Sequence, residues 1–291
     1  MILVTGATGQ TGSEIVRQLS GAGVKVRALV RDLKKAAALR NGNVEIVQGD
    51  LDREETLDMA LKGIEKVYLL SSADPRQVEL HSKMIRAAKR AGVKHMVRHS
   101  AMGANPNSPV MLGKWHGMSE KELQESGIPF THLRPHYYMQ NTLMFAQTIN
   151  TQGVFFAPMK AGKIGLVDIR DIAAVAVKTL MESGHEGRTY EITGPESLSF
   201  RDVGGILSEV LGKTVTYVDV APEEARKGMM AAGLPEWLAD ALLQLYGAFA
   251  EGHGDVTTKV VADVAKKQPI SYKQFAKDHS QIFSGVVAAR V

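Results

Sequence analysis

The feature that most constrains this chain is a glycine-rich loop at its very start. A short apolar strand at residues 2–4 runs directly into the loop, and a helical pattern follows from Ser13. The three loop glycines have the spacing of a dinucleotide-binding turn: Gly6 allows the tight turn, Gly9 lets the backbone approach a pyrophosphate, and Gly12 lets the helix pack closely. The amide groups at the helix start then face the phosphates. This loop predicts a nucleotide-binding α/β fold.

Apolar runs alternate with helical patterns after the loop. Strands are predicted at residues 24–30, 44–47, 66–70 and 95–99, with helical patterns at 33–39, 54–61 and 79–91 between them. Such alternation is typical of a Rossmann-type, doubly wound parallel sheet, with helices on both faces and ligands at the carboxyl ends of the strands.

The second half of the chain departs from this pattern. A helix at 119–125 and a strand at 129–133 complete a sixth unit, a strand–helix unit at 164–181 and a strand at 189–193 come later, and helices at 200–211, 222–232 and 235–250 follow. The segment 136–163 between these units is rich in aromatic, methionine and amide residues. We therefore expect an NAD(P)-binding domain over 1–134, completed by about 164–193. A smaller, mainly helical substrate-binding portion comprises 135–163 and 194–291.

Composition excludes several classes of protein. The 44% of hydrophobic residues suffices for a sizeable core, and the absence of cysteine excludes disulfides and cysteine-ligated metals. No run approaches the roughly 20 apolar residues of a membrane span, so we expect a cytoplasmic protein with no membrane partner. The net charge of +4 is spread over helix faces, which predicts no nucleic-acid partner. The apolar helix at 238–249 leaves both a monomer and a homodimer open.

An arginine follows the second strand, at the place where the adenosine ribose of a bound dinucleotide lies. Arg31 can bind a 2′-phosphate through charge-assisted hydrogen bonds, provided that Asp32 turns away. We therefore expect NADP(H) to be preferred over NAD(H). At the end of the third strand, Asp50 can bind the adenine amino group with Leu51 against the ring, or Asp50 can cap the helix that begins at Glu54.

Small residues end the fourth strand, where they allow a cofactor to pass close to the backbone. The expected cofactor-binding residues are Gly6, Thr8, Gly9, Gln10, Thr11, Gly12, Arg31, Asp50, Leu51, Ser71, Ser72 and Pro135.

Several stretches, taken together and in order, resemble the NmrA-like branch of the atypical short-chain dehydrogenases/reductases. They are residues 4–9, 28–31, 49–50, 126–135 and 167–173, and the resemblance spans essentially the whole chain. That branch includes quinone reductases, azo-dye and triphenylmethane-dye reductases, and NADP sensors without catalytic activity. The resemblance thus implies a cofactor site first and an activity second.

The main departure from the wider family concerns the catalytic pair. Standard members use a tyrosine and a lysine four residues later, and the lysine lowers the pKa of the phenol that protonates the substrate. Leu112 and His116 stand at these positions, whereas Ser100 matches the family's catalytic serine. We therefore expect an acceptor that takes hydride without a strong acid, such as a quinone or an azo or triarylmethane dye.

Candidate catalytic residues are His116, Tyr137 and Ser100. His116 has a near-neutral reference pKa and could donate a proton, although a structural histidine explains it equally well. The candidate substrate contacts share aromatic or amide side chains that stack on or orient a planar ligand, and ordinary core packing explains each of them too. They are Tyr137, Tyr138, Gln140, Asn141 and Phe155.

We expect no metal site, because the histidines on and after the strands lack the usual ligand spacing. Asp168 and Asp171 are more simply explained as helix-capping residues. The sequence thus favours a reductase of small, conjugated aromatic acceptors. A non-enzymatic NADP(H)-sensing regulator is the alternative, and an enzyme differs from it by an open cavity beside the cofactor.

Overall fold

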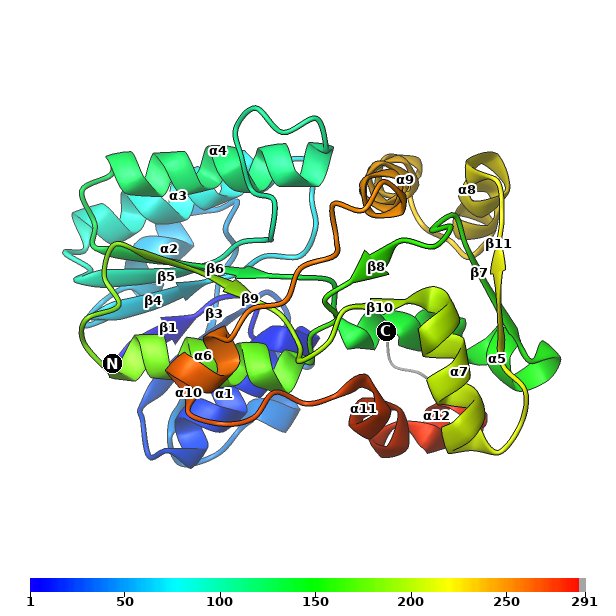
Figure 1. Ribbon diagram of the computed structural model, residues 1–291. Helices are drawn as coiled ribbons and strands as arrows, with labels where there is room; N and C mark the ends of the chain where they lie inside the picture. Colours follow the sequence, from blue (N-terminus) through cyan, green and yellow to red (C-terminus); the bar gives the residue numbers. More distant parts are fainter. Residues whose placement is uncertain (288–291) are drawn as a thin grey trace.

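The computed structural model describes residues 1–287, and its centre is a seven-stranded parallel sheet (Figure 1). The strand order is β3-β2-β1-β4-β5-β6-β9. The strands are β1 (Ile2–Val4), β2 (Val26–Val30), β3 (Val44–Gln48), β4 (Lys66–Leu69), β5 (His95–His99), β6 (Phe130–Pro135) and β9 (Arg188–Ile192). The order reverses at β1, which pairs with β2 on one side and β4 on the other. Ligands of such sheets bind at this reversal, beyond the carboxyl ends of the strands.

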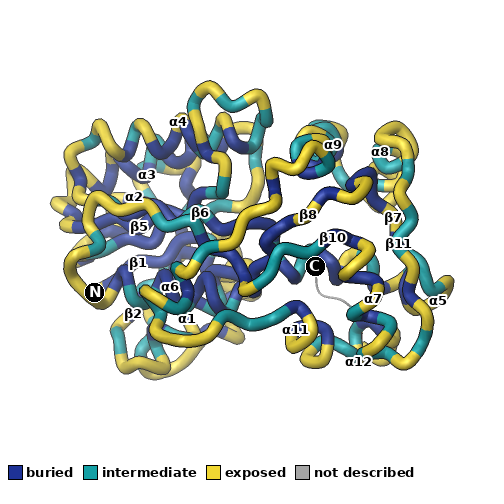
Figure 2. The backbone as a smooth tube through the Cα atoms, in the orientation of Figure 1, coloured by how far each residue is buried: buried dark blue, intermediate teal, exposed yellow. Residues whose placement is uncertain are grey.

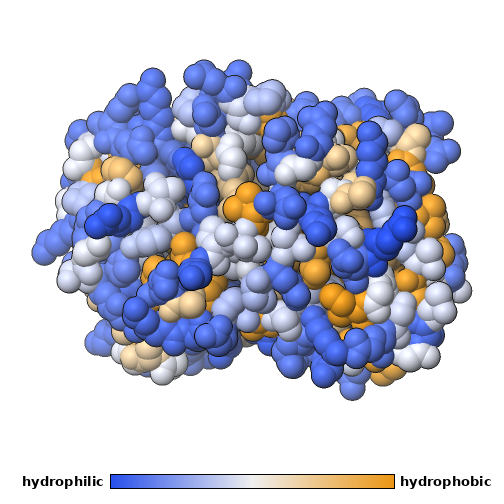
Figure 3. Space-filling view, in the orientation of Figure 1, coloured by the Kyte–Doolittle hydropathy of each residue, from blue (hydrophilic) through white to orange (hydrophobic). Residues whose placement is uncertain are grey.

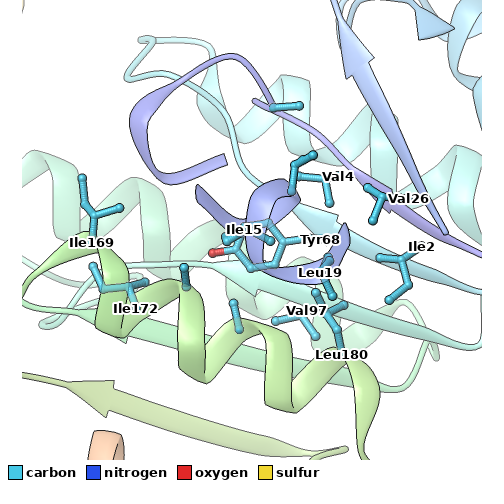
Figure 4. Packing of buried hydrophobic residues seen from close by; sticks show 14 of the residues in the cluster. Ile2, Val4, Ile15, Leu19, Val26, Tyr68, Val97, Ile169, Ile172 and Leu180 are labelled. Carbon is cyan, nitrogen blue, oxygen red and sulfur yellow. The ribbon is translucent and has the colours of Figure 1, made fainter. Parts of the chain in front are cut away.

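Helices cover both faces of the sheet. One face carries α1 (Gln10–Gly21), α6 (Ile169–Met181) and α10 (Val260–Ala265), and the other carries α2 (Glu54–Ala60), α3 (Gln77–Arg90) and α4 (Met111–Glu125). Ile15 and Leu19 of α1 and Ile172 of α6 pack on the strands around Tyr68 and Val97 (Figure 4). The inner strands of the sheet are buried, the edge strands β3 and β9 are mostly half-buried or exposed, and the outward faces of the helices are exposed (Figure 2).

A second lobe lies beside the sheet and has a core of its own, built largely from aromatic residues. Its parallel strands are β7 (Val154–Ala157) and β11 (Thr216–Asp219), and its antiparallel strands are β8 (Lys163–Ile164) and β10 (Leu198–Ser199). Its helical segments are η2 (Met139–Phe145), α5 (Ala146–Gln152), α7 (Phe200–Leu211), α8 (Pro222–Ala231), α9 (Glu236–Ala250), α11 (Tyr272–Asp278) and α12 (Ser280–Phe283). These pairings join 135–163 to the segment after 194. The last four residues of the predicted substrate portion, 288–291, lie outside the described residues.

The predicted fold class is confirmed, and two predicted helices need correction. The segment 33–39 forms only a 3₁₀ turn, Ala37–Leu39, because so short a segment buries too little apolar surface to sustain a helix. Helix α4 begins at Met111, eight residues before the predicted start. The first half of α4 contains two glycines, which have low helix propensity, so the sequence did not predict it as helical. One of these glycines is required, because a Cβ at Gly117 would lie 2.2 Å from the backbone of Asn105.

The surface of the molecule is mostly polar, with apolar side chains in scattered patches on the face drawn in Figure 3. No helix within residues 1–287 combines the length and the apolar character needed to cross a bilayer.

Candidate functional site

The loop after β1 is held against the end of β4. The hydroxyl of Thr5 donates to the carbonyl of Leu70 at 2.6 Å and accepts from the Leu70 amide at 2.8 Å. Gly6 has a φ of +60°, which favours glycine, and a Cβ there would lie 2.9 Å from the same carbonyl. A Cβ on Gly12 would lie 2.2 Å from the carbonyl oxygen of Gly6. Both glycines are therefore required by close backbone contacts.

The start of α1 is built to receive an anion. Gly9 is the N-cap residue and provides no capping side chain, and the first turn contains no acidic residue. By contrast, α6 is capped by Asp168 and carries Asp171 in its first turn. The positive end of the α1 dipole is thus left without a protein carboxylate, as a dinucleotide pyrophosphate requires. Thr8, Gly9 and Gln10 are exposed there, so the residues present fit such a cofactor.

An exposed arginine, Arg31, directly follows β2. Arg31 is exposed, its guanidinium has no carboxylate partner within residues 1–287, and its carbonyl accepts from the Gln48 side chain at 3.1 Å. The carboxylate of Asp32 accepts from the backbone amide of Lys34 at 2.8 Å, so Asp32 caps its own turn. Arg31 is therefore an exposed cation that Asp32 does not pair with.

The remaining cofactor candidates lie at the carboxyl edge of β3, β4 and β6. Asp50 accepts from the amide of Asp52 at 3.1 Å, whereas the residue before α2 is Arg53. The interpretation of Asp50 as the cap of that helix is therefore wrong. Leu51 packs in the core between the sheet and helices α2 and α3, Ser72 is exposed, and Pro135 ends β6.

Ser100 and Glu120 belong to a buried ion-pair network. The Ser100 hydroxyl donates to Glu120, whose carboxylate also accepts two hydrogen bonds from Arg134, at 3.0 and 2.6 Å. These hydrogen bonds lower the pKa of Glu120 against the opposing effect of burial. The hydroxyl of Ser100 is thus already engaged by Glu120 within the protein.

Two of the aromatic candidates are core residues of the second lobe. The hydroxyl of Tyr137 lies 2.9 Å from that of Tyr246, and burial raises the pKa of Tyr137 well above its usual value. Its side chain also bonds to Asn141. Phe155 is fully buried against Phe200 and neighbouring rings. Packing accounts for both aromatic side chains, which corrects the expectation that Tyr137 offers a hydroxyl to a substrate.

Tyr138 faces the first turn of α1. Its hydroxyl bonds to Nε2 of His99 and to the side chain of Thr11. The other ring nitrogen of His99, Nδ1, contacts the hydroxyl of Tyr68 at 2.5 Å. Tyr138 therefore links the phosphate-binding turn to the buried sheet.

A cavity of about 360 Å³ borders the loop on the side of the second lobe. Gln10 and Gln140 line it from the loop and from the segment after β6. The side-chain oxygen of Gln140 accepts from the amide of Ile169 at 3.2 Å, which fixes the amide plane. The remaining lining residues are Glu14, Ile169, Arg170, Asp278 and His279.

His116 lies beside a buried arginine. One of its ring nitrogens, Nδ1, is 3.2 Å from the guanidinium of Arg98 and 3.2 Å from the side-chain nitrogen of Gln77. Burial, followed by the charge of Arg98, lowers the pKa of His116 well below its usual value. The ring is therefore neutral at pH 7, and the premise of a near-neutral pKa is wrong.

Reasoning from sequence missed Arg98 and Glu120. A signal for Arg98 was present: it is the one arginine inside a predicted strand of otherwise apolar and histidine residues, and charged residues are rarely buried without a purpose. Glu120 gave no such signal, because a glutamate in a helical pattern is normally exposed.

The fold and the loop define a dinucleotide-binding protein of the Rossmann type, and comparison with known proteins gives the family. The profile described as the NmrA-like family matches residues 1–277, so the chain belongs to that family. It is 42% identical to the NAD(P)H azoreductase of Xenophilus azovorans over 283 residues, which is 97% of this chain and 99% of the relative.

Solved structures agree with this assignment. The NADPH-dependent quinone oxidoreductase of Escherichia coli, in complex with NADPH, has a TM-score of 0.88 and 32% identity over 96% of this chain and 99% of its own. The Citrobacter triphenylmethane reductase, in complex with NADP(H), has a TM-score of 0.86 and 28% identity over 95% and 99%. The transcriptional regulator NmrA, with a TM-score of 0.81, 22% identity and coverage of 98% and 97%, shares the fold alone.

Proposed function

We propose that this protein uses NADPH to reduce quinones or similar conjugated, electron-poor aromatic acceptors, with azo and triarylmethane dyes included. The protein is an NAD(P)H-dependent reductase, as its named relatives are. One observation about the chain supports a conjugated acceptor over an ordinary carbonyl. Leu112 and a neutral His116 stand where a tyrosine and a lysine would form a proton relay, so these two positions supply no acid able to protonate an ordinary alkoxide.

The residues that would hold the cofactor follow the carboxyl edge of the sheet. Amides at the start of α1 would bind the pyrophosphate, and Arg31 would bind the 2′-phosphate, which is the basis for proposing NADPH over NADH. Ser71, Ser72 and Pro135 would lie along the path of the cofactor. When bound, the nicotinamide supplies a hydride.

The role of the protein is then to position the acceptor. The cavity beside Gln10 and Gln140 has the volume of a small-molecule site and touches the loop directly. Its two amides can orient a substrate oxygen or nitrogen, and Tyr138 keeps the first turn of α1 in place. We propose that residues 135–163 and 194–291 form the substrate-binding portion, because the segment after β6 and the C-terminal helices both line this cavity.

The test is NADPH oxidation by the purified protein with a panel of quinones, azo dyes and triarylmethane dyes, and with simple aldehydes and ketones as controls. We expect turnover with conjugated acceptors only. Turnover with none of them, together with tight NADP(H) binding, would instead favour the regulatory alternative. Equal turnover with aldehydes would contradict the argument from the missing relay.

A further inference from the structure

Arg98 is a fully buried cation on the side of β5 that faces α3 and α4. Within residues 1–287 it has no ion-pair partner, and its Nη1 atom has no hydrogen-bond partner. The nearby carboxylate of Glu120 is already paired with Arg134. An unpaired buried charge costs several kcal/mol in general, so its presence calls for a functional explanation.

The guanidinium of Arg98 contacts the Nδ1 atoms of two histidine rings. Its Nε donates to Nδ1 of His81 at 3.3 Å, and its Nη2 lies 3.2 Å from Nδ1 of His116. Because arginine only donates hydrogen bonds, both Nδ1 atoms must accept. Each neutral ring then carries its proton on Nε2.

One of the two Nε2–H groups, that of His81, reaches the carboxyl edge of the sheet. Nε2 of His81 lies 3.0 Å from the hydroxyl oxygen of Ser71, which follows β4. Since His81 donates there, the hydroxyl proton of Ser71 is free to point elsewhere. His116 is partly exposed, and its Nε2 atom has no hydrogen-bond partner within residues 1–287. One buried cation thus sets the tautomer of both histidines, of which His81 is buried and His116 is partly exposed.

We propose that Arg98 is a positioning residue for the reduction: it fixes His116 and His81 as Nε2–H tautomers, so that His116 and Ser71 present neutral hydrogen-bond donors to the electron-rich product of hydride addition. This inference rests on the proposed function. The donors stabilise the negative charge that forms on the acceptor oxygen or nitrogen, and water then supplies the proton. The buried charge of Arg98 strengthens both donors by polarising the rings.

The first test reads the tautomers directly, by ¹⁵N NMR of the histidine rings in the full-length, cofactor-free protein. We expect Nδ1 of His81 and His116 to be unprotonated in the wild type. In Arg98→Met we expect mixed tautomers. Arg86→Met is the matched control, because Arg86 is an exposed, ion-paired arginine on α3. Protonated Nδ1 atoms in the wild type would overturn the proposal, whatever the activity.

The second test separates positioning from folding. With a quinone as acceptor, Arg98→Met should lower kcat at least tenfold with little change in the Kd for NADPH, and Arg98→Lys should recover most of the loss. Both should be measured well below the melting temperature of each variant. A wild-type kcat in folded Arg98→Met would overturn the inference. If Arg98→Met does not fold, the proposal is still tested by the tautomers of the wild-type protein and by the kcat of Arg98→Lys. A wild type inactive with every acceptor would refute the proposed function instead and leave the tautomer result standing.

Discussion

Replacing Gly12 by alanine tests how closely the cofactor loop and α1 are packed. The new Cβ would lie 2.2 Å from the carbonyl oxygen of Gly6, against the 3.0 Å below which real Cβ atoms essentially never come. The loop and the helix must therefore separate by about 0.8 Å, a strain typical of overpacked cores that cost about 1–3 kcal/mol. The same movement displaces the helix amides, and we expect the Kd for NADPH to rise at least about tenfold, or about 1.4 kcal/mol.

The assay combines urea unfolding with titration of NADPH by fluorescence. Gly21→Ala is the matched control, because Gly21 ends the same helix and a Cβ there meets nothing within 4 Å. We expect this control to be neutral or slightly stabilising and to bind NADPH normally. Wild-type stability and wild-type affinity in Gly12→Ala would refute the argument that a close backbone contact requires this glycine.

Three further predictions follow from the same structure. Arg31→Asp should weaken NADPH binding far more than NADH binding. By contrast, Arg27→Gln on β2, the strand that ends just before Arg31, loses its bonds to Glu45 and two carbonyls and should lower stability without changing cofactor preference. Tyr137→Phe should leave kcat unchanged and lower the free energy of unfolding by about 1–3 kcal/mol, since the Tyr246 hydroxyl loses a buried partner; a fall in kcat alone would return Tyr137 to the mechanism. Burial lowers the folded-state pKa to about 3 in His99 and to about 4 in His95, His132 and His136. The free energy of unfolding should therefore be at its full value above pH 6.5 and decrease toward pH 4. The decrease should reach up to about 1.4 kcal/mol per pH unit for each of these histidines, because the unfolded chain takes up protons that the folded protein does not. A free energy of unfolding in urea that stays constant between pH 7.5 and 5 would contradict these lowered histidine pKa values.

The sequence was sufficient for the sheet and the loop because both follow local rules. Buried parallel strands are short apolar runs, and β5 was predicted at its observed bounds, as was α7, which has a serine cap and an aspartate in its first turn. The glycine loop was recognised by its spacing. The structure adds the reason for that spacing, which is contact with the backbone of Leu70 and Gly6.

The candidate site was less predictable because it depends on contacts between distant segments. The hydroxyl of Tyr137 meets Tyr246 over a separation of 109 residues, and no local pattern reports such a partner. The strands β7 and β11 pair across about 60 residues, and this pairing buries Phe155, which the sequence offered as a candidate substrate contact. Most importantly, the pKa of His116 is lowered by its burial in the fold and then by the charge of Arg98, which lies on a different element.

We propose that a hydride passes directly from NADPH to a conjugated acceptor and that the protein provides no proton relay. The most direct measurement is the single-turnover rate with a quinone, using NADPH deuterated at the transferred position and, separately, D₂O as solvent. We expect a clear slowing with deuterated NADPH and a solvent isotope effect close to one. A large solvent isotope effect, with no effect of the deuterated cofactor, would contradict it.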